Sequence, residues 1–186
     1  MKHLKLFETK DDYQAFINSD RFVTPNISMI NNEGISYHPH TKIEILPNRT
    51  ITYTASDKLV EVSGSWVSGL HTDTFNCPIV AHEFANGVGT IIFEDDVTTL
   101  GKYSFDGCTT LTSIVLPETV VEFGDRVFNY CSNLSKITIN AIIAPVITRQ
   151  TFNGVKEGGE LIYPEGSDYS EWLRTDSYYL GYYGWK

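Results

Sequence analysis

Residues 91–113 read IIFEDDVTTLGKYSFDGCTTLTS, and residues 114–136 read IVLPETVVEFGDRVFNYCSNLSK. At a step of 23 residues the apolar positions of the two segments coincide, whereas the polar positions vary. A fixed period of this kind is typical of a solenoid, in which each coil packs its apolar side chains onto the coil before it. The coinciding pairs are Ile91 and Ile114, Phe93 and Leu116, Val97 and Val120, Leu100 and Phe123, Gly101 and Gly124, Phe105 and Phe128, Cys108 and Cys131, and Leu111 and Leu134.

A third copy of the pattern begins at Ile137, and it departs from the first two. Val146 and Ile147 replace the aromatic residue and the glycine, and Phe152 follows Phe128 by 24 residues rather than 23. Such departures are typical of a terminal repeat. We therefore predict a mostly β fold with short helices, built on a small solenoid of two to three coils of about 23 residues each.

Each coil should contain a short strand, such as Ile114–Leu116, ended by Pro117. Because side chains alternate along a strand, Ile114 and Leu116 should point inward while their neighbours point outward. Gly101 and Gly124 fall where the backbone turns, and we expect a left-handed conformation at both. The predicted outward row, which is a candidate binding surface, consists of Thr90, Ile92, Ser113, Val115, Lys136 and Thr138.

The pattern F-x-x-C-x-x-L-x-x-I-x-L-P-x-x-V-x-x-F-G-x-x-x-F closely resembles the BspA-like leucine-rich repeat family, over about residues 84–186. The resemblance implies a non-catalytic module for binding or adhesion, which presents its repeats to a protein or a glycan. It is carried by Phe105, Cys108, Leu111, Ile114, Leu116, Pro117, Val120, Phe123, Gly124 and Phe128.

We predict four parts along the chain: residues 1–40, 41–83, 84–164 and 165–186. The first part should hold a helix after Thr9 and a β-hairpin turning at residues 31–34. It resembles a short amino-terminal module of gut-bacterial phage and prophage-encoded proteins, which implies attachment to a larger particle or formation of a homo-oligomer. Residues 41–83 should form antiparallel strands that cover the first coil, with a loop at 63–80. The repeats occupy residues 84–164.

The last part, residues 165–186, is predicted to be an aromatic cap. Ser167 and Asp168 precede Tyr169, Trp172 and Leu173 at helical spacing, which predicts a short helix. The aromatic side chains that follow either close the last coil as a lid or stack on a sugar ring or partner surface. These candidate binding residues are Tyr178, Tyr179, Tyr182, Tyr183 and Trp185.

Composition narrows the classes of partner. The formal net charge is −9. Residues 81–186 carry 14 acidic and 7 basic side chains, so the repeats are the acidic part of the chain. An acidic surface repels phosphate backbones, which argues against nucleic acid. No apolar run is long enough for a membrane span or a signal peptide. We therefore expect cytoplasmic synthesis followed by assembly, unless a leader has been removed.

The chain shows few candidate groups for chemistry. Three cysteines cannot all pair, and Cys108 and Cys131 should stack as small apolar residues unless the coil spacing allows a disulfide. His38 and His40 form a pair with no evident third metal ligand, and residues 94–96 form an acidic cluster without the spacing of a calcium loop. We predict no metal and no cofactor. Motifs of nucleophilic or nucleotide chemistry are absent, so we predict that the protein is not an enzyme.

Three functions follow from these observations. The first is a binding or adhesion module displayed on a phage virion or a bacterial surface. The second is a purely structural component of a virion or assembly, attached through residues 1–40. The third is a carbohydrate-active enzyme, because a pair of carboxylates for glycoside hydrolysis is defined by its separation in space and not by a motif.

Overall fold

The computed structural model describes residues 47–63, 67–148 and 150–186. The helix and hairpin predicted within residues 1–40, together with His38 and His40, lie outside the described residues. The described part is mostly β, and its only helices are two 3-10 helices of three and four residues. The mostly β fold class is therefore confirmed for this part of the chain.

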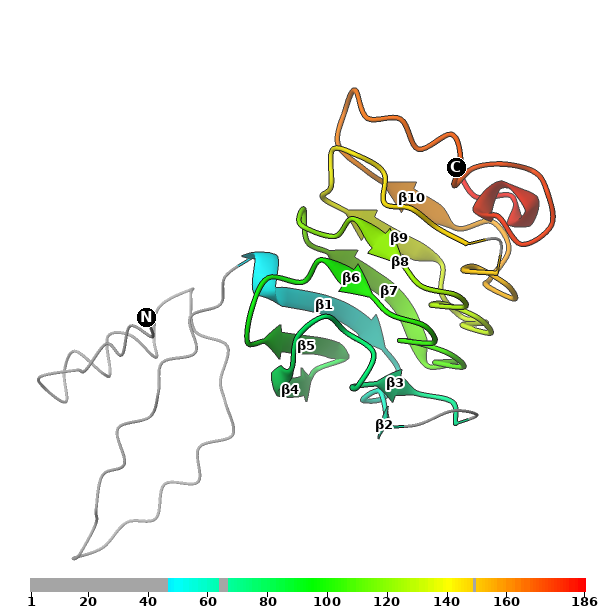
Figure 1. The fold of residues 1–186 in the computed structure, drawn as a ribbon. Helices are drawn as coiled ribbons and strands as arrows, with labels where there is room; N and C mark the ends of the chain where they lie inside the picture. The colour runs from blue at the N-terminus through cyan, green and yellow to red at the C-terminus, as the bar shows by residue number, and fades with distance from the viewer. Residues whose placement is uncertain (1–46, 64–66, 149) are drawn as a thin grey trace, which may run out of the picture. The chain divides into compact units, whose positions relative to one another are not determined.

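A six-stranded sheet contains most of the strand residues that the structure describes (Figure 1). Its strands lie in the order β10-β9-β7-β1-β5-β4. Two small parallel pairs, β2 with β3 and β6 with β8, complete the sheets. The strands are β1 (Thr50–Ala55), β2 (Glu61–Val62), β3 (Leu70–His71), β4 (Ile79–Ala85), β5 (Val88–Phe93), β6 (Thr99–Leu100), β7 (Leu111–Leu116), β8 (Glu122–Phe123), β9 (Lys136–Ile139) and β10 (Glu160–Ile162), and the 3-10 helices are η1 (Pro47–Arg49) and η2 (Leu180–Tyr183).

The repeat period sets the register of the parallel strands. Ile114 of β7 pairs with Ile137 of β9, which pairs with Leu161 of β10. Across the core, Leu100 of β6 pairs with Phe123 of β8. Equivalent residues of successive repeats therefore lie side by side in both places, as the sequence predicts.

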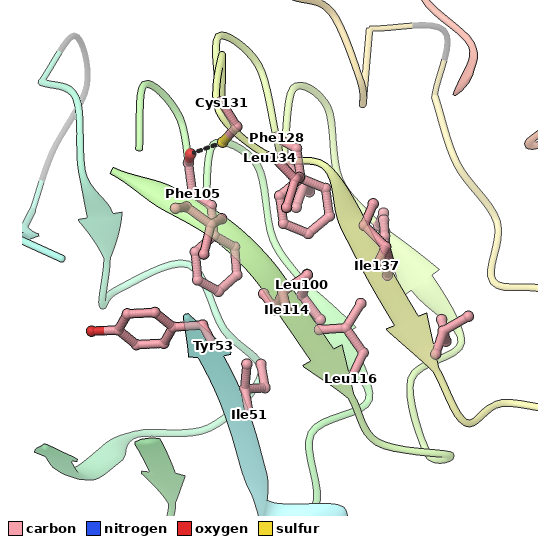
Figure 2. Packing of buried hydrophobic residues seen from close by; sticks show 14 of the residues in the cluster. Ile51, Tyr53, Leu100, Phe105, Ile114, Leu116, Phe128, Cys131, Leu134 and Ile137 are labelled. Atoms are coloured by element: carbon pink, nitrogen blue, oxygen red, sulfur yellow. Dashed lines mark hydrogen bonds between the residues drawn. The ribbon is translucent and has the colours of Figure 1, made fainter. Parts of the chain in front are cut away.

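Repeat-equivalent aromatic side chains stack in the core between these strands. The ring of Phe128 lies 5.5 Å from that of Phe105 and 6.0 Å from that of Phe152, and both pairs are close to parallel. All three side chains are fully buried. Figure 2 shows Phe105 and Phe128 in the cluster together with Ile114, Leu116 and Ile137. The predicted contact between side chains one repeat apart is confirmed.

The two repeat glycines are needed for a different reason from the one predicted. Neither Gly101 nor Gly124 has a positive φ, so the expected left-handed conformation is wrong. A Cβ on Gly124 would lie 2.5 Å from the backbone nitrogen of Lys102, and one on Gly101 would lie 1.8 Å from the carbonyl oxygen of Thr74. Each glycine therefore lets one coil approach the backbone of the segment before it.

The first predicted coil is not packed directly against the second in the sheet. β5, which contains Ile91, is separated from β7 by β1, and β1 runs antiparallel to both neighbours. β4 and β5 form a hairpin across Asn86 and Gly87, both with positive φ (52° and 81°). Such a two-residue Asn-Gly turn favours an antiparallel pair. The sheet therefore changes from parallel to antiparallel at β1.

The segment before β4 also packs against the repeats. The backbone N–H of Gly69 donates to the carbonyl of Asp106 (2.7 Å), and that of His71 donates to the carbonyl of Ser104 (2.9 Å). Phe75 forms an antiparallel bridge with Leu100, and its ring lies 5.8 Å from that of Phe105. This part of the predicted 63–80 loop therefore covers the open side of the first stacked repeat.

The carboxyl-terminal residues cover the other end. Trp172 is fully buried, with its ring 5.0 Å from that of Phe123, and its Nε1–H donates to the carbonyl of Pro145 (3.0 Å). The Tyr169 hydroxyl donates to the carbonyl of Ala141 (2.8 Å). The predicted short helix at these residues is wrong: the chain makes turns there, and the only described helix that follows is η2.

Phe128 tests the stack because it lies between the other two rings. We expect Phe128→Ala to lower the free energy of unfolding by about 3–5 kcal/mol, since it removes a fully buried ring and leaves a cavity. The measurement is chemical denaturation of the full chain. Val60→Ala, at a side chain that is 68% exposed, is the control and should change stability by less than about 0.5 kcal/mol. A loss below about 1 kcal/mol for Phe128→Ala would contradict the stack.

A buried histidine links the antiparallel strands. His82 of β4 has a side chain that is 2% exposed, and it lies between Glu61 (Nδ1 to Oε1, 2.7 Å) and Tyr53 (Nε2 to the hydroxyl, 2.8 Å). Because a carboxylate only accepts, Nδ1–H donates to Glu61, and Nε2 accepts from the Tyr53 hydroxyl. That hydroxyl also accepts from the backbone N–H of Leu59 (3.2 Å). The network is complete with neutral His82.

This network predicts a dependence of stability on pH. Burial lowers the pKa of His82, and Lys58 adds to that effect against the opposing influence of Glu61. A histidine with a lowered folded-state pKa stabilises the fold above its unfolded value of about 6.5, and this contribution is lost as the pH falls below it. Burial raises the pKa of the neighbouring Glu83, whose contribution has the opposite sign at lower pH.

We therefore expect the free energy of unfolding to fall by about 1 kcal/mol between pH 7.5 and pH 5.5. His82→Gln, which keeps a donor and an acceptor but does not titrate, should be less stable at pH 7.5 and should show a smaller loss over the same interval. Denaturation at several pH values measures both slopes. Equal slopes in the two proteins would show that His82 is not the responsible group.

Candidate interaction surface

Two rows of outward side chains run across neighbouring strands of the sheet. In the first row, Thr52 of β1 pairs with Val115 of β7, Val115 with Thr138 of β9, and Thr138 with Ile162 of β10. The second row is formed in the same way by Thr54, Ser113, Lys136 and Glu160. We call these eight residues the outer face. Four of the six predicted row residues, Ser113, Val115, Lys136 and Thr138, lie in it.

The other two predicted residues lie on the same side of the sheet as the outer face, but they are buried. Thr90 and Ile92 lie on β5, beyond β1, where they pair with Thr52 and Thr50. Thr90 is 7% exposed and Ile92 is 5% exposed. The expectation that they are exposed is wrong, because alternation fixes the face on which a side chain lies but not what covers that face. Thr52 takes the neighbouring place beside Val115.

The outer face mixes hydroxyl, charged and small apolar groups. The Thr54 hydroxyl lies 2.6 Å from that of Ser113 and 2.8 Å from that of Thr112. Lys136 Nζ and Glu160 Oε2 form an ion pair at 2.9 Å. Val115 and Ile162 are each 37% exposed. A surface of this kind, with hydrogen-bonding groups around apolar side chains, suits contact with another protein.

The aromatic tail divides between the two predicted roles. Trp185 is 4% exposed and belongs to the core cluster, and its Nε1–H donates to the carbonyl of Lys156 (2.7 Å). Tyr183 is partly buried against the same cluster, and its hydroxyl accepts from the N–H of Gly154 (2.9 Å). These two residues form the lid. Tyr178 and Tyr182 are 36% and 55% exposed, whereas Tyr179 is partly buried and less exposed than either.

Exposed apolar side chains also occur at a place that the sequence analysis did not select. Val121 and Val146 are 61% and 69% exposed, and they belong to neighbouring coils, since the N–H of Val146 donates to the carbonyl of Val121 (3.0 Å). Ile142 and Ile143, in the preceding turn, are 72% and 84% exposed. The sequence does indicate this exposed apolar patch, because two isoleucines stand in a turn where the preceding repeat has the polar residues Glu118 and Thr119.

A polar ladder along the repeats was also missed. Asn129 Nδ2 donates to Asp106 Oδ1 (2.6 Å), and Asn153 Nδ2 donates to Asn129 Oδ1 (2.7 Å). These residues recur at steps of 23 and 24 in the sequence. Asn129 is 6% exposed. The ladder satisfies buried polar groups between coils, so its role is structural.

The acidic cluster at residues 94–96 binds a guanidinium group of the same chain. Arg49 Nη1 donates to the carbonyl of Glu94 (2.8 Å), and its side chain forms ion pairs with Asp96 (3.4 Å) and Asp95 (3.9 Å). Among the described residues, no group of three or more histidine, cysteine, aspartate or glutamate side chains could hold a metal ion. The cation at this acidic turn is therefore the Arg49 guanidinium of the same chain.

Cys108 and Cys131 are buried free thiols. Burial raises the pKa of Cys108 to about 12 and that of Cys131 well above its ordinary value. The Cys131 thiol donates to the carbonyl of Phe105 at 3.0 Å, as the dashed line in Figure 2 shows. Because the thiolate is the reactive form, these side chains act as small core residues.

The ion pair on the outer face gives a test of how the face tolerates change. Lys136 and Glu160 have side chains that are 45% and 60% exposed. We expect Lys136→Ala to lower the free energy of unfolding by less than about 1 kcal/mol, because exposed pairs contribute little. Chemical denaturation at low and high salt checks this. A loss above about 2 kcal/mol would show that the outer face serves stability rather than contact.

The comparisons with known proteins concern the repeats. The family model described as BspA type leucine-rich repeat region (6 copies) matches residues 79–171, which is half of the chain. A crystal structure of a leucine-rich repeat protein from Bacteroides ovatus matches with 19% sequence identity and a TM-score of 0.26. That match covers 60% of this chain and 37% of the other. No curated protein matches. Across the described residues, none of the helices has the length and apolar character needed to span a bilayer.

Proposed function

The chain belongs to the family of BspA-type leucine-rich repeat proteins, and from this premise we propose that it is a non-catalytic binding or adhesion module. Its outer face is the contact surface, and its partner is a protein. The repeats over residues 84–164 act as a short solenoid of two to three coils, and together with β1 they carry this face. The family match favours a repeat protein over the carbohydrate-active enzyme considered above.

One observation carries the proposal: the continuity of the outer face. Thr52, Val115, Thr138 and Ile162 follow one another across four hydrogen-bonded strands. Neighbouring strands lie about 4.8 Å apart, so the row extends roughly 15 Å. Val115 is at its centre, with a threonine on either side. An exposed valine among hydroxyl groups offers apolar contact at the centre and hydrogen bonds around it.

Display on a bacterial surface or on a virion remains part of the proposal. In this proposal, residues 1–40 serve as the attachment module expected from the sequence. In the alternative, that module makes the chain a structural component of a larger particle. Full incorporation of a chain that lacks residues 1–40 into such a particle would rule out this attachment role.

Val115 provides the test of the outer face. We expect Val115→Glu to reduce binding to proteins on an array of immobilised extracellular proteins and glycans by about tenfold or more, since it places a charge at the centre of the contact. Val60→Glu, the same change at a side chain that is 68% exposed and lies off the sheet, should bind as the unchanged protein does.

Both variants are first checked by denaturation, and each should retain its stability to within about 1 kcal/mol. Unchanged affinity of Val115→Glu for the retained proteins would remove the outer face as the site. Retention of no protein on the array would count against a protein partner.

A further inference from the structure

A surface hollow lies among residues 174–182, near the carboxyl-terminal end of the chain, and none of its lining residues belongs to the outer face. Its volume is about 420 Å³, within the range of small-molecule sites. Two of its lining residues are tyrosines from the aromatic tail, and the other four are polar. The lining consists of Arg174, Thr175, Asp176, Ser177, Tyr179 and Tyr182.

The backbone holds this hollow in place from below. The N–H of Leu180 donates to the carbonyl of Trp172 (2.9 Å), and the N–H of Tyr182 donates to the carbonyl of Arg174 (3.1 Å). Leu180 and Trp172 are fully buried in the core cluster. A Cβ on Gly181 would lie 2.0 Å from the carbonyl oxygen of Leu173, so the helix η2 packs tightly on the preceding segment. The hollow is therefore built on ordered structure.

Arg174, which lines the hollow, is paired with two carboxylates. Its Nε and Nη2 lie 2.8 Å and 2.7 Å from Asp176 Oδ2, and its Nη1 lies 3.0 Å from Glu171 Oε1. The guanidinium also lies over the ring of Tyr179, with Cζ 4.8 Å from the ring centroid. A guanidinium has five N–H donors, so some remain for a ligand. The carboxylates likewise keep acceptor capacity.

The local charge argues against an anionic ligand. One guanidinium and the two carboxylates of Asp176 and Glu171 sum to −1, so a carboxylate or phosphate would meet net repulsion. The hydroxyls of Thr175 and Ser177 add groups that both donate and accept. Tyr182 is 55% exposed and offers an aromatic ring. These groups match a neutral ligand with several hydroxyls and an apolar C–H face.

We propose that this hollow binds a neutral saccharide unit, with its C–H face against Tyr182 and its hydroxyls on the Arg174–Asp176 pair, Thr175 and Ser177. Tyrosine suits this role because it combines a large apolar ring with a polar tip. The assignment rests on the proposed binding function and gives it a second ligand class at a separate site. A shallow, open hollow predicts weak affinity for a single unit.

The experiment uses the full chain with four probes: the methyl glycosides of glucose, galactose, mannose and N-acetylglucosamine. Saturation-transfer NMR and titration should show binding of at least one with a millimolar Kd. Tyr182→Ala should weaken it about tenfold, whereas Tyr182→Phe, which keeps the ring, should weaken it much less. Tyr130→Ala, at a tyrosine that is 61% exposed, lies beside Gly154 and does not line the hollow, is the matched control and should leave it unchanged. Methyl glucuronide should bind more weakly than methyl glucoside, because of the local negative charge.

The outcomes separate this proposal from the function of the outer face. Absence of binding by all four glycosides, or binding that Tyr182→Ala and Tyr130→Ala affect equally, overturns the saccharide site and leaves the effect of Val115→Glu unaffected. Stronger binding of the glucuronide overturns the neutral ligand class. Glycoside binding that depends on Tyr182, together with protein binding that ignores Val115→Glu, would support this site and remove the proposed protein face.

Discussion

The stacking of equivalent side chains on neighbouring coils is the contact on which the rest of the structure depends. Phe105, Phe128 and Phe152 each bury a ring that a single coil could not cover. Because the rings lie 5.5–6.0 Å apart, the backbones of successive coils must also approach closely. That approach requires Gly124 beside Lys102, and it brings Asn129 within hydrogen-bonding distance of Asp106. The outer face is regular because the core behind it is regular.

The sequence was sufficient to predict how the strands of the later repeats pair, but not how the strands before β7 pair. The period of 23 residues predicted the pairing of Ile114 with Ile137, because repeats with the same apolar positions stack with equivalent residues side by side. It also aligned Ile91 with Ile114, yet β1 lies between their strands. Periodicity shows which residues are equivalent. It does not show whether a strand from outside the repeats lies between two repeat strands. The Asn86–Gly87 turn was the available signal that β5 belongs to a hairpin.

The candidate surfaces show the same division. Within the parallel strands, alternation placed Ser113, Val115, Lys136 and Thr138 on one face, and the structure agrees. At the chain's tail, five aromatic residues were equivalent in the sequence, but only the packing separates the buried Trp185 from the exposed Tyr182. A buried tryptophan or tyrosine usually needs a hydrogen-bond partner for its polar atom. Trp185 finds the carbonyl of Lys156, and such a partner 29 residues away is set by the tertiary fold.

The direction of β1 also determines where this architecture can be enlarged. An extra unit copied from residues 114–136 would need a parallel strand on each side, and β7, β9 and β10 supply that environment. The junction of β1 with β7 is antiparallel and follows a different hydrogen-bond pattern, so a duplicated unit would not fit there. Gene duplication or design can therefore add repeats between β7 and β10. A repeat would not fit at the antiparallel junction of β1 with β7, so that end of the repeat array is fixed.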